Sequence, residues 1–141
     1  RKKQEIKFNI QKDPQLSGII GNDTDNKIGE TFILRKTKTL FEILEKYKAP
    51  KIIDYFSFDV EGAETRIFKN FPFDKFIFLL INIERPSKLL TDILKRNGYI
   101  CIGGNPCDRY FIYKKFFSSF SFFKKLEIIF ISNIQRIFRK I

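Results

Sequence analysis

The stretch that decides the fold runs from an apolar segment directly into acids and a glycine: Asp54-Tyr55-Phe56-Ser57-Phe58-Asp59-Val60-Glu61-Gly62-Ala63-Glu64. In an open α/β sheet, ligands bind beyond the carboxyl ends of the strands, so acids that follow a buried strand lie at a crevice. Side chains alternate along a strand, so Asp59 and Glu61 share one side. Two carboxylates this close repel each other unless a cation, a proton, hydroxyls or backbone N–H groups offset the repulsion. The stretch therefore predicts a candidate site.

The residues after these acids predict a sharp turn into a helix. Gly62 allows the chain to turn, and Glu64 falls in the first helical turn, where the positive end of the helix dipole favours an acid. A structural alternative stays open at this point, because Glu61 and Glu64 could both serve only to cap that helix.

Composition indicates one globular domain with a basic end. The chain has 141 residues, of which 43% are hydrophobic and 30% charged. The net charge of +11 is concentrated after Tyr113, where seven Lys or Arg face a single acid, Glu127. Such a surface attracts anionic lipid, an acidic partner or nucleic acid, of which we expect nucleic acid least.

The cysteines favour a reducing compartment. Cys101 and Cys107 are too few for a disulfide framework, and a chain without histidine cannot assemble an ordinary zinc site, so we assign no metal ligand. No apolar run near Arg1 resembles a signal peptide, which favours a cytoplasmic location. Because the chain holds no methionine and begins at Arg1, we expect further sequence upstream.

Strand and helix patterns alternate along the middle of the chain. After a mostly irregular segment over residues 1–30, we expect strands over 31–35, 52–58, 76–83, 99–102 and 109–113, and helices over 39–49, 63–70 and 87–97. Thr39 and Glu42 have the capping-box spacing, Ser87 is a good N-cap, and Asn97-Gly98 a typical helix end. This order predicts an α/β fold with a parallel sheet, covered on both faces and closed by an antiparallel edge strand.

The tail after Tyr113 has a different pattern. On a helix, one apolar stripe contains Phe116, Phe120, Phe123, Phe130, Ile134, Ile137, Phe138 and Ile141, and the opposite side carries Ser118, Lys125, Ser132, Arg136 and Arg139. The charge-free runs are too short to span a bilayer. The stripe either packs on the domain or on a second copy of the chain, or lies in the interface of an anionic membrane.

The ordered motifs resemble the C-terminal half of the FkbM-type methyltransferases. The resemblance rests on the acidic stretch quoted above and on Thr37-Lys38-Thr39-Leu40, Phe71-Pro72-Phe73-Asp74, Ile83-Glu84, Asn97-Gly98-Tyr99 and Asp108-Arg109-Tyr110. It divides the chain into a loosely matched segment over 1–36, a methyltransferase half over 37–113 and a basic, Phe-rich tail over 114–141. It implies a partial Rossmann-like sheet with a C-terminal amphipathic helix.

The resemblance also implies a chemistry for the acids. Members of this family use S-adenosylmethionine and mostly methylate hydroxyl groups of sugars, polyketides or other small molecules. By this likeness Asp59 is the base or orienting group, Glu61 and Glu84 support it, and Asp59 and Gly62 lie beside the methyl donor. A carboxylate can orient or deprotonate an acceptor hydroxyl, and a negative site favours the cationic donor.

The chain departs from this family in one respect. The glycine-rich loop and the second-strand acid that hold the donor have no counterpart, and Gly18-Ile19-Ile20-Gly21 lacks the spacing. Two hypotheses follow. The chain is the C-terminal part of a methyltransferase completed by upstream sequence, or it is a non-catalytic interaction or trafficking domain that docks on membranes through its tail.

Overall fold

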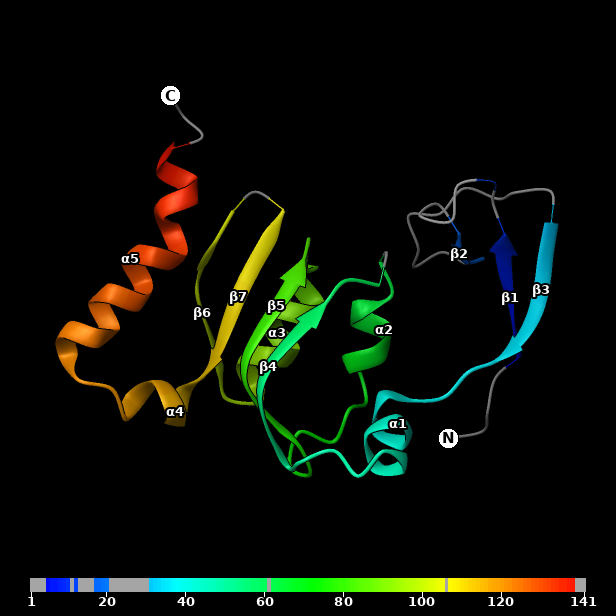
Figure 1. The fold of residues 1–141 in the computed structure, drawn as a ribbon, viewed down its shortest axis with the longest axis horizontal. Helices are drawn as coiled ribbons and strands as arrows, with labels where there is room; N and C mark the ends of the chain where they lie inside the picture. Colours follow the sequence, from blue (N-terminus) through cyan, green and yellow to red (C-terminus); the bar gives the residue numbers. More distant parts are fainter. Residues whose placement is uncertain are drawn as a thin grey trace.

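The computed structural model describes residues 5–10, 12, 17–20, 31–60, 62–105 and 107–138, of which 132–138 are described as backbone alone. The elements, in chain order, are β1 (Glu5–Ile10), β2 (Gly18–Ile19), β3 (Thr31–Lys36), α1 (Leu40–Lys46), β4 (Ile52–Phe58), α2 (Glu64–Phe68), β5 (Ile77–Glu84), α3 (Lys88–Arg96), β6 (Tyr99–Gly104), β7 (Asp108–Tyr113), α4 (Lys114–Ser118) and α5 (Phe122–Phe138). Figure 1 shows the two sheets that they form.

The main sheet has the strand order β4-β5-β7-β6. β4 and β5 are parallel, whereas β7 runs antiparallel to both β5 and β6. The predicted position of the antiparallel strand was therefore wrong, because β7 lies inside the sheet and not at its edge. The α3 crossover leaves a space of one strand between β5 and β6, and β7 returns from β6 by a short hairpin to fill that space.

The predicted helix boundaries and caps are largely confirmed. The Thr39 hydroxyl accepts a hydrogen bond from the Glu42 amide, and the Glu42 carboxylate accepts one from the Thr39 amide, which completes the capping box of α1. Ser87 caps α3 in the same way by accepting from the Leu90 amide. Gly98 follows α3 with a φ of 87°, a conformation that glycine adopts at low cost.

The core lies between the main sheet and its helices, and it is built mainly from phenylalanine. Phe68 of α2 is fully buried, and its ring lies 4.8 to 6.3 Å, centroid to centroid, from five other Phe rings. Tyr99 is buried in the same cluster, and its hydroxyl accepts a hydrogen bond from the Phe78 amide. Burial raises the pKa of Tyr99 to about 12, although that hydrogen bond lowers it and Tyr113 raises it further.

The expectation that β4 is covered on both faces was wrong. β4 lies at one edge of the main sheet, and its apolar side chains Ile52 and Tyr55 are more than half exposed. On the other hand, Phe56 and Phe58 of the same strand pack against Phe68. The carboxyl end of β4 is therefore buried under α2, whereas much of the rest of this edge strand is exposed.

The described segments of residues 1–30 contain two strands where none was predicted. β1, β2 and β3 form a separate antiparallel sheet in the order β2-β1-β3, and the predicted strand over 31–35 is confirmed as β3. The alternation of Glu5, Lys7 and Asn9 with Ile6, Phe8 and Ile10 was the available signal for β1. Residues 21–30, including the glycine-flanked loop over 21–29, lie outside the described residues.

The C-terminal tail is two helices and not one. α4 ends at Ser118, the chain bends through Ser119–Ser121, and α5 then continues to Phe138 beside β6 (Figure 1). The break falls in a run of serines, whose hydroxyls compete for backbone hydrogen bonds. The Ser119 hydroxyl donates to the Phe116 carbonyl, and the Ser121 hydroxyl accepts from the Lys124 amide. Within the described residues, no helix has the length and apolarity needed to span a bilayer.

Candidate functional site

The carboxyl ends of β4 and β5 carry two of the predicted site residues. Phe58 and Ile83 are buried register partners in this parallel pair, so the residues that follow them, Asp59 and Glu84, reach the same end of neighbouring strands. Asp59 is exposed, and Glu84 is half-buried. The register thus brings these two acids to one edge of the sheet, as predicted. Asp59 does not line either of the two cavities described below.

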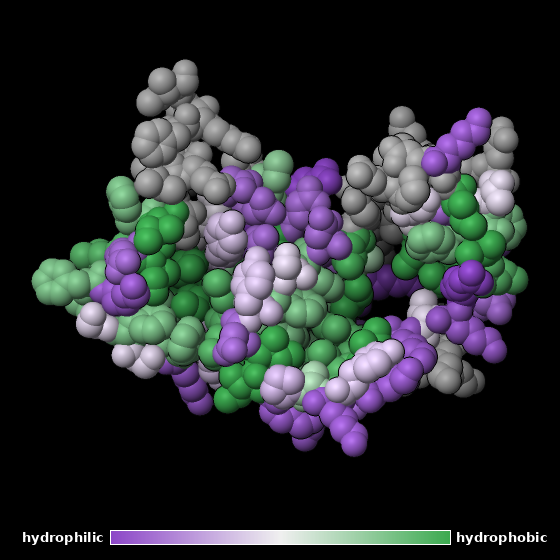
Figure 2. All heavy atoms as spheres, in the orientation of Figure 1, coloured by the Kyte–Doolittle hydropathy of each residue, from purple (hydrophilic) through white to green (hydrophobic). Residues whose placement is uncertain are grey.

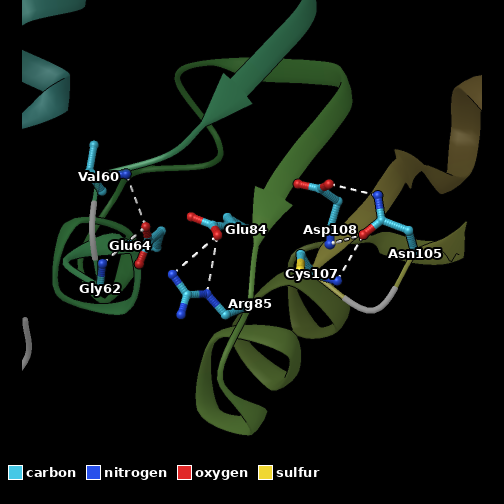
Figure 3. Close-up of polar contacts among 8 residues, drawn as sticks. All are labelled: Val60, Gly62, Glu64, Glu84, Arg85, Asn105, Cys107 and Asp108. Carbon is cyan, nitrogen blue, oxygen red and sulfur yellow. Dashed lines mark hydrogen bonds and ion pairs between the residues drawn. The ribbon is translucent and has the colours of Figure 1, made fainter. Parts of the chain in front are cut away.

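The turn after β4 is held by Glu64. Its carboxylate is buried, and one oxygen accepts hydrogen bonds from the amides of Val60, at 3.0 Å, and Gly62, at 3.4 Å (Figure 3). Gly62 has a φ of 90°, so the sharp turn uses the left-handed conformation that favours glycine. Both amides precede α2, so Glu64 fixes the turn before the helix, and the capping of α2 by this carboxylate stays a prediction. Glu61, the remaining acid of the turn, lies outside the described residues.

Arg85 offsets the charge of Glu84. Its guanidinium lies 3.1 Å from a carboxylate oxygen of Glu84, and its own backbone has a φ of 40°. The Arg85 amide also donates to the carbonyl of Cys107, which ties the end of β5 to the β6–β7 hairpin. A cation was one of four groups expected to offset the repulsion between Asp59 and Glu61, and Arg85, which directly follows Glu84, was not singled out.

The β6–β7 hairpin is organised by a buried amide. The Asn105 oxygen accepts from the amides of Cys107 and Asp108, both at 2.8 Å, and the Asn105 nitrogen donates to the Asp108 carboxylate at 2.7 Å (Figure 3). The Arg109 guanidinium donates to the carbonyls of Asn105 and Asp108. These bonds fix the hairpin next to Glu84, because Glu84 and Asp108 are register partners of β5 and β7.

A cavity of about 340 Å³ lies beside this hairpin. Its walls come from the turn after β5, from α3 and from the hairpin, through Arg85, Pro86, Thr91, Cys101, Cys107, Arg109 and Phe111. Both cysteines are free thiols in this structure. Two guanidinium groups in one concavity suit a ligand with an anionic or strongly hydrogen-bonding group. Arg85, which forms an ion pair with Glu84, therefore lines this cavity, whereas Asp59 does not.

A second cavity, of about 400 Å³, lies between the small sheet and α2. It is lined by Glu5, Ile6, Lys7, Ile19, Ile20 and Arg66. None of the predicted site residues belongs to it. Among the described residues, no group of three or more Cys, Asp or Glu side chains could hold a metal ion.

Comparison with known proteins gives one match. The family model described as the methyltransferase FkbM domain matches residues 8–101, two thirds of the chain. That range contains β4 and β5, whose ends carry Asp59 and Glu84. No curated protein and no solved structure matches the chain. The mixed sheet and its helices are consistent with part of a Rossmann-like methyltransferase fold, which confirms the predicted fold class.

Proposed function

Because the chain belongs to the methyltransferase FkbM domain family, we propose that it forms the C-terminal part of an enzyme that methylates a hydroxyl group of a small hydroxylated or sugar-like molecule. The observation that carries the proposal is the register of β4 and β5, which ends both strands at one level with an acid on each. S-adenosylmethionine, the donor that this family implies, would supply an electrophilic methyl group.

The acids have distinct roles in this proposal. Asp59 is exposed, so an acceptor hydroxyl can reach its carboxylate, which would orient the hydroxyl and accept its proton. Glu84 is held by Arg85 and lines the same edge, where it accepts a hydrogen bond from a neighbouring hydroxyl of the acceptor. Glu61 is assigned a supporting role from the sequence alone.

The fit of the donor to this chain is partial. Carboxylates at the strand ends suit the cationic sulfonium and ammonium groups of S-adenosylmethionine, and Gly62 leaves room for close approach at the turn after β4. The glycine-rich loop that would hold the rest of the donor has no counterpart in residues 1–141. Donor binding therefore needs elements besides those described here.

One test compares two acids of the same segment. Asp59→Asn in the full-length protein should lower turnover by about 10²- to 10⁴-fold, the usual contribution of a general base, and leave the free energy of unfolding within about 0.5 kcal/mol. Asp54→Asn is the matched control, because Asp54 is also exposed and lies on β4. Formation of S-adenosylhomocysteine with a panel of glycosides and small alcohols gives turnover, and urea unfolding gives stability.

Calorimetric titration with S-adenosylmethionine separates binding from turnover. The full-length protein should bind the donor, and Asp59→Asn should weaken that binding if Asp59 lies beside it. A full-length protein that folds but binds no donor would contradict the proposal. That result would favour the second hypothesis, a non-catalytic domain of the same fold, which is consistent with the absence of Asp59 from both cavities.

A further inference from the structure

The tail helix α5 exposes a continuous apolar stripe. Phe122, Leu126 and Phe130 follow one another at intervals of four residues, and Phe123 and Ile129 flank them. These five side chains are 41% to 80% exposed, and Figure 2 shows hydrophobic side chains gathered on the surface at the α4–α5 end of the molecule. We call these five residues the tail stripe. It differs from the predicted stripe, in which Phe122 and Ile129 had no place.

The described part of the domain leaves the tail stripe exposed. α5 contacts β6, and over residues 122–131 its half-buried side chains are Lys125 and Ile128, which lie on another side of the helix. Lys125 is turned back toward α4, where its ammonium group donates to the Ser118 carbonyl. Of the sequence alternatives for the tail, packing of these five residues on their own domain is therefore set aside.

Charge distinguishes the two remaining partners for the tail stripe, which are a second copy of the chain and an anionic membrane. Residues 114–141 contain seven Lys or Arg and one acid, Glu127, which already forms an ion pair with Lys124 at 3.0 Å. Two copies of the tail paired along their stripes would bring these positive charges together, which is unfavourable. An anionic lipid surface attracts them instead, by about 1 kcal/mol for each basic residue near it.

We propose that α5 lies in the interface of an anionic lipid membrane, with the tail stripe among the acyl chains and the basic residues at the headgroups. Its 17 residues give a helix of about 25 Å, long enough to place all five side chains in one plane of contact. This membrane contact is independent of the proposed enzymatic function.

A single fluorophore tests the orientation of α5. The chain has no tryptophan, so Phe130→Trp provides one reporter on the tail stripe, and Ile131→Trp provides a matched control, exposed on another side of the same helix. With vesicles of phosphatidylcholine and phosphatidylserine, Phe130→Trp emission should shift to the blue and Ile131→Trp emission should shift less. Equal shifts, or none, would overturn the proposal.

Vesicle sedimentation tests the energetics. Binding to the mixed vesicles should weaken as salt rises, because surface charge is screened over about 8 Å at physiological ionic strength and about 3 Å at 1 M. Phe122→Ala should lower the partition coefficient roughly tenfold, since a buried Phe contributes about 1.5 kcal/mol or more, whereas Ile131→Ala should change it little. No binding, salt-independent binding, or a stripe variant that only converts a dimer to a monomer would contradict the proposal.

Discussion

Phenylalanine has opposite environments in the two halves of the molecule. Around α2 and β5, Phe68, Phe76 and Phe78 are fully buried, and their rings contact one another or other Phe rings. In α5, Phe122 and Phe123 contact each other at 5.9 Å between centroids but remain more than two thirds exposed. The difference arises from the partner element. A sheet provides a broad apolar face for a helix, whereas α5 meets β6 along only one side.

This contrast shows how to interpret the aromatic content of the chain. Eighteen Phe residues could reflect an oversized core, yet among those whose side chains the structure describes, some form a packed cluster and others are exposed. The first set contributes to the free energy of folding, and the second is available for binding. Comparing a substitution in the core with a matched substitution on the surface should therefore distinguish effects on the free energy of unfolding from effects on binding.

The largest difference in the free energy of unfolding is expected between the loss of a buried Phe ring and the loss of an exposed one. Phe68→Ala removes contacts with five Phe rings and leaves a cavity in the core, so the free energy of unfolding should fall by about 3 to 5 kcal/mol. Phe123→Ala, at 80% exposure, should change it by less than about 0.5 kcal/mol. Urea unfolding followed by circular dichroism measures both. Similar losses for the two variants would remove the distinction between core and tail.

An intermediate difference is expected for two acids. Glu64→Gln removes the charge that accepts hydrogen bonds from Val60 and Gly62 and should cost about 1.5 to 3 kcal/mol. Glu127→Gln breaks only an exposed ion pair between residues three apart on α5 and should cost about 0.2 to 0.5 kcal/mol. If Glu64→Gln were as mild as Glu127→Gln in thermal unfolding, the turn would not depend on the buried carboxylate.

The smallest effect on stability at neutral pH is expected for Tyr99, whose contribution should also depend on pH. Burial raises the pKa of Tyr99 above its ordinary value of 10, to about 12, so the folded state keeps the phenol proton longer than the unfolded state. This contribution to stability is complete below pH 10 and is lost as pH rises toward 12. Tyr99→Phe should cost about 1 kcal/mol at neutral pH, through the lost hydrogen bond to Phe78, and should flatten the alkaline decrease.

The exposed Tyr47 supplies the control for that prediction. Tyr47→Phe should leave both the neutral stability and the slope between pH 10 and 12 close to those of the parent chain, because Tyr47 is 71% exposed. Stability measured by urea unfolding across this pH range compares the three proteins. An unchanged slope in Tyr99→Phe would mean that other groups cause the alkaline loss.

Local signals in the sequence predicted local structure well. The Thr39–Glu42 capping box, the Ser87 cap and the Gly98 stop each depend on residues a few positions apart, and each is found as predicted. The acids at the strand ends were also predicted, because a buried strand fixes where its carboxyl end lies. Short-range chemistry of this kind needs no knowledge of the rest of the chain.

Features that depend on distant partners were missed. The local sequence of β7 does not predict its position between β5 and β6, because that position depends on how far the α3 crossover displaces β6 from β5. The coverage of β4 depends on its neighbours in space, and the inward side of α5 depends on where Ser119–Ser121 bends the chain. The ion pair of Arg85 with Glu84 likewise required the backbone conformation of Arg85, which the sequence does not reveal.

The edge position of β4 has a consequence for Asp59. An outer strand leaves alternate peptide groups along one margin without ladder partners in the part of the chain described here, and a further parallel strand can dock on that margin. Such docking would extend the row of strand ends past Asp59. The carboxylate would then lie in the middle of a row of strand ends and no longer at the outer rim of the sheet. Completion of the sheet would thereby enclose its acid.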